Sequence, residues 1–410
     1  EEAEKEADIL KKEALLQAKD KFYQEKAEFE KETVEKRQEL QNLEKRIVQK
    51  ESHLDKKVEL IEPLFVRPLV KIESGRNDSN PVWSPGGAFI AFERSVGDKK
   101  EIRITLPDGT PIQTIYFRLS DGRKELKFFF PGVSEETSYN AGITWAPDQC
   151  RFVYMSNGGE GNYDIYLQEL GANAPVRLTD HKEKDGQAHW SPIADRLVFV
   201  SGRTGKGDLY LQDLGTRVLT RLTQGGKAYL YPQWSPDGKR LVMMHGSNEN
   251  HDIILINDVT KPMESQKRLT TWPYDDLRPI WSPDGKKIAF YSNYNPAGDP
   301  KTWSIVVVAA DGSDPSEGEE LVAKVVAMDV IPDVEVGPAW MPDSSRIVFV
   351  KNDRQEYNPI YLADLKEKTV IPLKTDTKMN HDIACSSDGT IAFRAQVDKW
   401  DQIFVMKLKD

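Results

Sequence analysis

The residues best placed to act together chemically occupy one position of a motif that recurs seven times along the chain. Five residues before the Trp of each copy, or before Cys385 in the last copy, the side chain is a carboxylate in four copies and an amide in two. Copies arranged around an axis would place this column on a ring, where clustered carboxylates attract a cation or a basic peptide tail. The column consists of Asp78, Asn140, Asp185, Tyr229, Asp276, Glu335 and Asn380.

The same column also has a purely local interpretation. Asp and Asn favour the passage from a loop into a strand, because their short side chains bond to nearby backbone groups. Two hypotheses therefore stand side by side: a negatively charged rim of a central channel that binds a partner, and turn chemistry that involves no partner.

Motifs of the common enzymes are missing from the sequence. It has no G-x-S-x-G nucleophile elbow. The histidine pairs His181 with His189 and His245 with His251 do not have the spacing of metal ligands. The glycines at 158–161 and 225–226 are typical of hairpin turns and not of a phosphate-binding loop. We therefore expect a protein that is not an enzyme and that holds no metal or cofactor.

The repeated motif reads Trp-Ser-Pro-Asp-Gly in its complete form, as at 234–238 and 281–285. A strand ends at the Trp, and a tight turn follows, because Pro presets φ while Asp and Gly tolerate left-handed backbone. Four of the six intervals between copies are 44 to 47 residues, which is typical of a four-stranded propeller blade. The intervals of 62 and 59 indicate insertions near 118–140 and 312–335. The repeat positions are Trp83, Trp145, Trp190, Trp234, Trp281, Trp340 and Cys385.

This pattern predicts an all-β fold, a seven-bladed β-propeller with four-stranded blades over residues 63–410; six blades is the alternative if one weak copy is degenerate. The chain ends on 402–408, the third strand of the last copy. A strand-like segment near 65–72 precedes the first copy. We predict that this segment pairs with the last blade and closes the ring, which removes an exposed strand edge.

The Trp-Ser-Pro-Asp-Gly core and the strands around it closely resemble the propeller repeats of TolB, and those of tricorn protease and prolyl-oligopeptidase-type enzymes, over residues 64–410. The resemblance implies a propeller that binds a protein or peptide partner. TolB itself has six blades by family pattern. The hydrolase domain that accompanies the propeller in prolyl-oligopeptidase-type enzymes has no counterpart in this sequence.

Residues 1–62 differ in character from the rest of the chain. They contain no Gly and no Pro, mix acids with bases, and repeat apolar residues at steps of seven and eleven. This composition predicts a long α-helical coiled coil, with a single charged helix lying against the propeller as the alternative. The segments 9–20 and 44–57 resemble the coiled-coil region of bacterial ribonuclease Y. That resemblance implies a homo-oligomer through residues 1–62 and a membrane tether upstream of residue 1.

Together these features favour a non-catalytic scaffold that presents a binding face near a membrane. The alternative is an accessory or gating subunit of a hydrolase or peptidase complex. The net charge of −10 argues against a nucleic-acid partner. The two resemblances disagree on location: the ribonuclease Y coiled coil implies the cytoplasmic face of a membrane, which we expect here, and TolB-type propellers imply the periplasm.

Overall fold

The computed structural model describes Lys36 and residues 62–96, 99–117, 142–156, 162–172, 174–247, 250–294, 302–313, 324–333, 337–352 and 358–409. The chain divides into two units, Glu1–Leu60 and Ile61–Asp410. Apart from Lys36 and Glu62, the predicted coiled coil lies outside the described residues. No helix in the described part of the chain has the length and apolar character needed to cross a bilayer.

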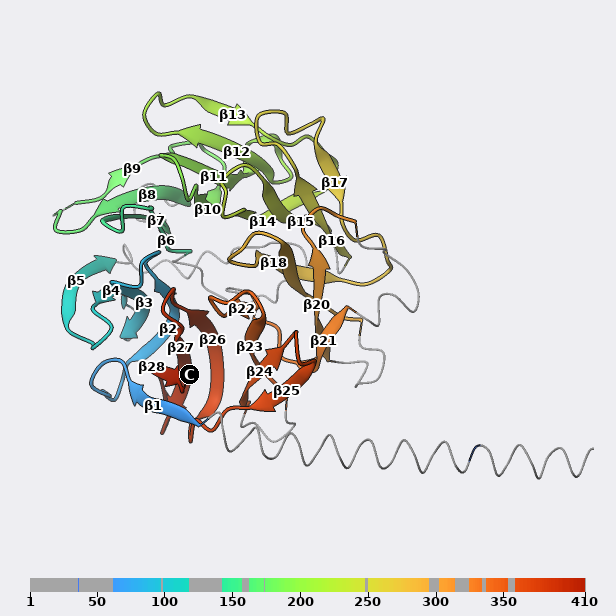
Figure 1. Cartoon of the computed structure of the whole chain (residues 1–410). Helices are drawn as coiled ribbons and strands as arrows, with labels where there is room; N and C mark the ends of the chain where they lie inside the picture. Colours follow the sequence, from blue (N-terminus) through green and yellow to red (C-terminus); the bar gives the residue numbers. More distant parts are fainter. Residues whose placement is uncertain are drawn as a thin grey trace, which may run out of the picture. The chain divides into compact units, whose positions relative to one another are not determined.

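Seven four-stranded antiparallel sheets make up the second unit, and they are arranged around a common centre (Figure 1). Each sheet corresponds to one copy of the repeat, so we number them blade 1 to blade 7 in the order of their repeat positions. The prediction of seven four-stranded blades is confirmed, and the six-bladed alternative is wrong.

The strands are given from the innermost to the outermost of each blade. Blade 1 contains β2 (Asn77–Trp83), β3 (Ile90–Val96), β4 (Lys99–Thr105) and β5 (Pro111–Phe117). Blade 2 contains β6 (Thr144–Trp145), β7 (Arg151–Ser156), β8 (Asp164–Glu169) and β9 (Val176–Arg177). Blade 3 contains β10 (Asp185–Trp190), β11 (Arg196–Ser201), β12 (Asp208–Asp213) and β13 (Leu219–Arg221). A 3-10 turn, η1 (Gly202–Thr204), follows β11.

Blade 4 contains β14 (Ala228–Trp234), β15 (Leu241–Gly246), β16 (His251–Ile256) and β17 (Gln266–Arg268). Blade 5 contains β18 (Asp276–Trp281), β19 (Lys287–Ser292), β20 (Trp303–Ala309) and β21 (Val325–Val330). Blade 6 contains β22 (Ala339–Trp340), β23 (Arg346–Val350), β24 (Ile360–Asp364) and β25 (Thr369–Pro372). Blade 7 contains β26 (Lys378–Cys385), β27 (Thr390–Val397), β28 (Trp400–Leu408) and, as its outer strand, β1 (Pro63–Pro68).

The ring is closed by the two ends of the propeller. Strand β1 pairs antiparallel with β28, from Phe65 opposite Lys407 to Pro68 opposite Phe404, and the two ends of the colour scale meet there in Figure 1. The sequence placed the closing strand near 65–72, whereas β1 runs from Pro63 to Pro68. This pairing gives blade 7 its fourth strand and covers the edge of β28 that would otherwise be exposed.

The turn after each inner strand is built by the motif residues themselves. In blade 5 the Ser282 hydroxyl donates to Asp284 Oδ1 at 2.6 Å and accepts from the Lys287 amide at 2.9 Å. The Gly285 amide donates to the Ser282 carbonyl at 2.8 Å, with Gly285 at φ +69°. Ser therefore closes the turn from inside, which explains why it recurs beside Pro, Asp and Gly.

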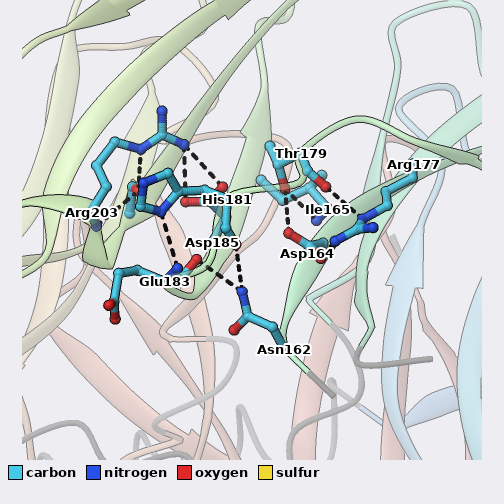
Figure 2. Close-up of polar contacts among 10 residues, drawn as sticks. Asn162, Asp164, Ile165, Arg177, Thr179, His181, Glu183, Asp185 and Arg203 are labelled. Atoms are coloured by element: carbon cyan, nitrogen blue, oxygen red, sulfur yellow. Dashed lines mark hydrogen bonds and ion pairs between the residues drawn. The ribbon is translucent and has the colours of Figure 1, made fainter. Parts of the chain in front are cut away.

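A second repeated contact joins the third and fourth strands of each of three successive blades. In blade 2, Arg177 pairs with the Asp164 carboxylate at 2.6 Å, and Thr179 Oγ1 accepts from the Ile165 amide at 2.9 Å (Figure 2). Blade 3 repeats it, because Arg221 pairs with Asp208 at 2.7 Å, and blade 4 does so with Arg268 and Asp252. The recurring Arg-Leu-Thr segments are therefore structural.

Candidate binding site in the central channel

The inner strand of every blade is distorted at the same place, three residues before the repeat Trp or Cys. All seven residues there have positive φ, between +50° and +85°. In five blades the ladder shifts register at this point, as a β-bulge does. We call these residues the bulge column; they are Asn80, Gly142, Gln187, Tyr231, Arg278, Gly337 and Asp382.

Five members of the bulge column carry a side chain in a conformation that disfavours one. Left-handed backbone costs a non-glycine residue roughly 1–2 kcal/mol, and such strain gathers at sites where a side chain has to be aimed. A bulge turns the side chain at that point out of its ordinary alternation. The distortion therefore redirects one side chain in each of the five blades whose bulge residue is not glycine.

The inner strands of blades 1 to 5 enclose a cavity of about 630 Å³. Bulge-column residues and the repeat tryptophans line it, and the exposed prolines that follow those tryptophans by two residues surround its turn end. This volume lies within the range of small-molecule and peptide pockets, roughly 300–1,000 Å³. The tryptophans are Trp83, Trp145, Trp190, Trp234 and Trp281, and the prolines are Pro85, Pro147, Pro192, Pro236 and Pro283.

The cavity walls are fixed by hydrogen bonds between neighbouring blades. At five junctions a repeat indole N–H donates to the carbonyl of the residue just before the repeat position of the preceding blade, at 3.1–3.4 Å. These pairs are Trp83 with Ala384, Trp145 with Val82, Trp234 with His189, Trp281 with Gln233, and Trp340 with Ile280.

Two junctions lack this bond. Cys385 has no indole, and the buried Nε1 of Trp190 has no hydrogen-bond partner in the described part of the chain. Blades 2 and 3 are joined instead by Thr144 Oγ1, which donates to the Ala188 carbonyl at 2.8 Å.

Bulge-column residues also contact one another around the cavity. The Asn80 amide donates to Asp382 Oδ2 at 3.2 Å, and the Tyr231 amide donates to Gln187 Oε1 at 2.8 Å. The Arg278 guanidinium stacks over the Tyr231 ring, 4.0 Å from its centroid. At Gly142 the row of side chains is interrupted, and an added Cβ would meet no atom within 4 Å. The cavity is therefore open at blade 2.

The electrostatics of the cavity come from few groups. Its described lining includes one acidic residue, Glu93, and one arginine, Arg278, and each is 7% exposed. Burial, followed by the charge of Arg278, lowers the pKa of His189 to about 4. His189 is therefore a neutral imidazole at physiological pH. In the described part of the chain, no three His, Cys, Asp or Glu side chains converge as metal ligands do.

The column predicted from sequence lies at the entry end of the same strands. Its five described members are buried, with exposures of 0–3%. Asp78 forms a two-bond ion pair with Arg94 at 2.6 and 2.7 Å. Asp185 pairs with Arg203 at 3.0 Å, as Figure 2 shows. The described members are Asp78, Asp185, Tyr229, Asp276 and Asn380.

The other described members of that column also have internal partners. Trp272 Nε1 donates to Asp276 Oδ1 at 3.1 Å, and Asn380 Nδ2 donates to the Asn358 carbonyl at 2.9 Å. The Tyr229 hydroxyl accepts from Gln266 Nε2 at 3.2 Å, and its ring packs at a tilt against His245 with ring centroids 4.3 Å apart. A buried polar group needs such a partner, so the structure places these residues inside the blades and not on an exposed rim.

Asn140 and Glu335 lie outside the described residues. Of the residues that line the cavity, the repeat tryptophans were identified from the sequence as strand ends, whereas the bulge column was not singled out. In the alignment of the repeats, the bulge column lies two residues after the predicted column, but its residues differ in charge, size and polarity. Its two glycines, Gly142 and Gly337, are the signal that could have indicated left-handed backbone there.

Comparison with known proteins agrees with this architecture. Residues 131–317 match the family model of the TolB beta propeller domain. Residues 1–63 match the model of the RNase Y N-terminal region. Both resemblances seen in the sequence are thereby confirmed, each for the segment its model covers.

Three solved structures illustrate the likeness. TolB from Acinetobacter baumannii is 20% identical, with a TM-score of 0.48 over 76% of this chain and 66% of that one. A puromycin-hydrolyzing peptidase from Mycobacterium tuberculosis is 12% identical, with a TM-score of 0.59 over 80% of this chain and 50% of that one. Oligogalacturonate lyase from Vibrio parahaemolyticus is 13% identical, with a TM-score of 0.60 over 83% and 93%.

The peptidase and the lyase share the β-propeller fold of this chain. The chain spans 66% of the A. baumannii TolB and 50% of the peptidase. Since one fold appears in two enzymes of different activity, the function has to be argued from the cavity and its residues.

Proposed function

We propose that this protein is a non-catalytic binding protein whose TolB-type propeller captures a segment of a partner protein in the central cavity. The single observation that carries the proposal is the cavity of about 630 Å³ itself, which has indole walls and side chains aimed inward by strained backbone. Walls of this kind are pre-organised, so little conformational entropy is lost on binding.

Residues 1–62 supply the second part of the proposal. They join several propellers into a homo-oligomer close to a membrane, on its cytoplasmic face, and the match to the RNase Y N-terminal region supports this arrangement. Linked binding modules gain avidity without any new contact. The periplasm is the alternative location, and the TolB-type repeats favour it.

The cavity is tested by filling it. Gly142→Tyr places a ring in the open space beside blade 2, in a left-handed position where blade 4 already holds Tyr231 at φ +51°. Gly171→Tyr is the matched control, because Gly171 also has positive φ and open space around it but does not line the cavity. Both changes add strain of roughly 1–2 kcal/mol.

Peptides are first selected for binding to the full chain from a random display library, and their affinities are then measured for both variants. We expect Gly142→Tyr to weaken the selected peptides about 10-fold or more, equivalent to about 1.4 kcal/mol, and Gly171→Tyr to leave them unchanged. Equal binding to both variants would place the site elsewhere, and a library that yields no binder would refute peptide capture.

The oligomer is tested by light scattering during size-exclusion chromatography, with the full chain compared with residues 62–410. We expect a multimer for the first and a monomer for the second. A monomeric full chain contradicts the oligomer and leaves the cavity proposal standing.

A second candidate function is an accessory or gating subunit of a hydrolase. The likeness to the M. tuberculosis peptidase supports it, since half of that chain is matched by this propeller. Turnover of peptide substrates by the purified full chain alone would favour an enzyme over both proposals.

A further inference from the structure

Three side-chain amides line the cavity and keep hydrogen-bonding atoms that no residue in the described part of the chain occupies. They are Asn80 of β2, Gln187 of β10 and Gln233 of β14, in blades 1, 3 and 4. The acidic residue and the arginine of the same lining, Glu93 and Arg278, are engaged by other residues of the protein. Capacity to bond a ligand therefore remains on neutral amides of the wall.

Two of these amides are oriented by a hydrogen bond of their own. The Tyr231 backbone N–H donates to Gln187 Oε1 at 2.8 Å, so Gln187 Nε2 is left as a donor. Asn80 Nδ2 donates to Glu93 Oε1 at 2.8 Å, so Asn80 Oδ1 is left as an acceptor. Since an amide has one acceptor oxygen and one donor nitrogen, the wall presents a fixed donor on blade 3 and a fixed acceptor on blade 1.

The third amide, that of Gln233, is left with both functions. Its half-buried side chain forms no hydrogen bond with a described residue, while its backbone carbonyl accepts from Trp281 Nε1 at 3.2 Å. Gln187 is bonded to the same strand two residues earlier, at Tyr231. A partly exposed amide on a fixed strand can exchange its water for a ligand at little cost.

A peptide main chain has the chemistry that matches such a wall. Each peptide unit pairs one N–H donor with one C=O acceptor, and each of these needs a partner when it leaves water. The indole and proline surfaces of the same cavity can cover apolar side chains. A charged ligand group would need a free counter-charge instead, and Glu93 and Arg278 are engaged already.

We propose that the cavity holds an uncharged peptide segment by its main chain, with Gln233 as a specificity-determining residue. A backbone N–H of the segment donates to Gln233 Oε1, and a backbone carbonyl accepts from Gln187 Nε2. This proposal rests on the proposed function, since it names how the captured segment is recognised. A cavity of about 630 Å³ has room for a segment of a few residues.

The probes are library-selected peptides that Gly142→Tyr excludes, together with analogues in which one backbone N–H at a time is replaced by an ester oxygen. Dissociation constants for the full chain and for Gln233→Met are measured by isothermal titration calorimetry. We expect Gln233→Met to weaken the peptides roughly 3- to 10-fold, the effect of one hydrogen bond. One ester analogue should lose the same factor against the unchanged chain and nothing further against Gln233→Met, because both changes remove the same bond.

Two more variants complete the test. Gln187→Glu keeps the acceptor for the Tyr231 amide and removes the donor, so it should also weaken the peptides roughly 3-fold or more. Gln212→Met is the matched control. Gln212 is a half-buried glutamine of β12 whose Oε1 has no partner among the described residues, and it does not line the cavity. This control should leave every affinity unchanged.

The outcomes separate this inference from the proposed function. If Gly142→Tyr excludes the peptides while Gln233→Met and Gln187→Glu bind them normally, main-chain recognition is overturned and peptide capture stands. Independent losses from Gln233→Met and every ester analogue overturn it too, as does an equal loss in Gln212→Met. A steep fall in affinity between 50 and 500 mM NaCl would show that charge is recognised instead. If no peptide of any kind binds, both proposals fail.

Discussion

At the scale of single residues, Asp276 shows how the repeat uses a carboxyl group that never reaches solvent. Burial raises its pKa to about 8, against the opposing hydrogen bonds of Ser292, Thr270 and Trp272. The group is therefore mostly protonated at pH 7 in the folded protein and ionised in the unfolded chain. Folding takes up a proton, so this residue's contribution to stability is fully present below pH 3.8 and is lost as pH rises toward 8.

Asp276→Asn should consequently stabilise the protein at neutral and alkaline pH. The amide keeps an acceptor for the Trp272 indole and has no proton to lose. We expect a gain of roughly 1–3 kcal/mol at pH 8 that disappears near pH 4. Urea unfolding of both proteins at pH 4.5, 6 and 8 measures the difference.

Asp78→Asn is the control in the same column. It breaks the buried ion pair with Arg94 and leaves that guanidinium without its carboxylate. We expect destabilisation of roughly 3–5 kcal/mol at pH 7.

A loss of stability in Asp276→Asn at pH 8 would show that its carboxylate is ionised in the fold.

At the scale of elements, the blades are held to one another by the repeat indoles. Trp281 Nε1 donates to the Gln233 carbonyl at 3.2 Å, whereas Trp190 Nε1 has no partner among the described residues. Both rings are buried and line the same cavity. The two tryptophans therefore differ in one hydrogen bond while their packing is similar.

This difference predicts unequal costs for the same substitution. Trp281→Phe loses ring area and the hydrogen bond to the Gln233 carbonyl, whereas Trp190→Phe loses ring area and a buried donor that has no partner among the described residues. We expect Trp281→Phe to be more destabilising by about 1–2 kcal/mol, as judged by the midpoint and slope of guanidinium unfolding. Equal costs would mean that the indole hydrogen bonds contribute little to blade packing.

At the scale of the whole molecule, one short strand closes a ring of some 350 residues. Strand β1 covers β28, and Leu69 beyond it is buried and donates to the Ile403 carbonyl at 2.8 Å. Without β1 the edge of β28 would be exposed, and exposed edges of this kind pair with other chains.

A chain that begins at residue 73 should therefore be less stable than one that begins at residue 62. We expect its thermal midpoint to fall by roughly 5 °C or more and its association to increase with concentration. Differential scanning calorimetry and light scattering measure the two effects. A peptide of residues 62–72 added in trans should restore part of the loss, and an unchanged midpoint for the shorter chain would show that closure is dispensable.

Much of the fold could be predicted because its information is local and repeated. A recurring interval of 44 to 47 residues, a Trp at the end of the inner strand in six of the seven copies, and a Ser-Pro-Asp-Gly turn specify four strands per blade and seven blades. Ring closure could also be predicted, because the last copy of the repeat has only three strands and a single strand-like segment precedes the first copy. These features depend on spacing along the chain, which a sequence displays directly.

The site depended on tertiary structure. The predicted column and the bulge column lie two residues apart on the same strands, and alternation alone would place them on one face. The bulge breaks that alternation, so that Arg278 lines the cavity while Asp276 is buried inside blade 5. A register shift of one residue exchanges the two faces of a strand, and no single residue type in the bulge column reveals it. The sequence by itself determined the number and order of the blades. Only the tertiary structure, through the bulges in the inner strands, decided which side chains face the cavity.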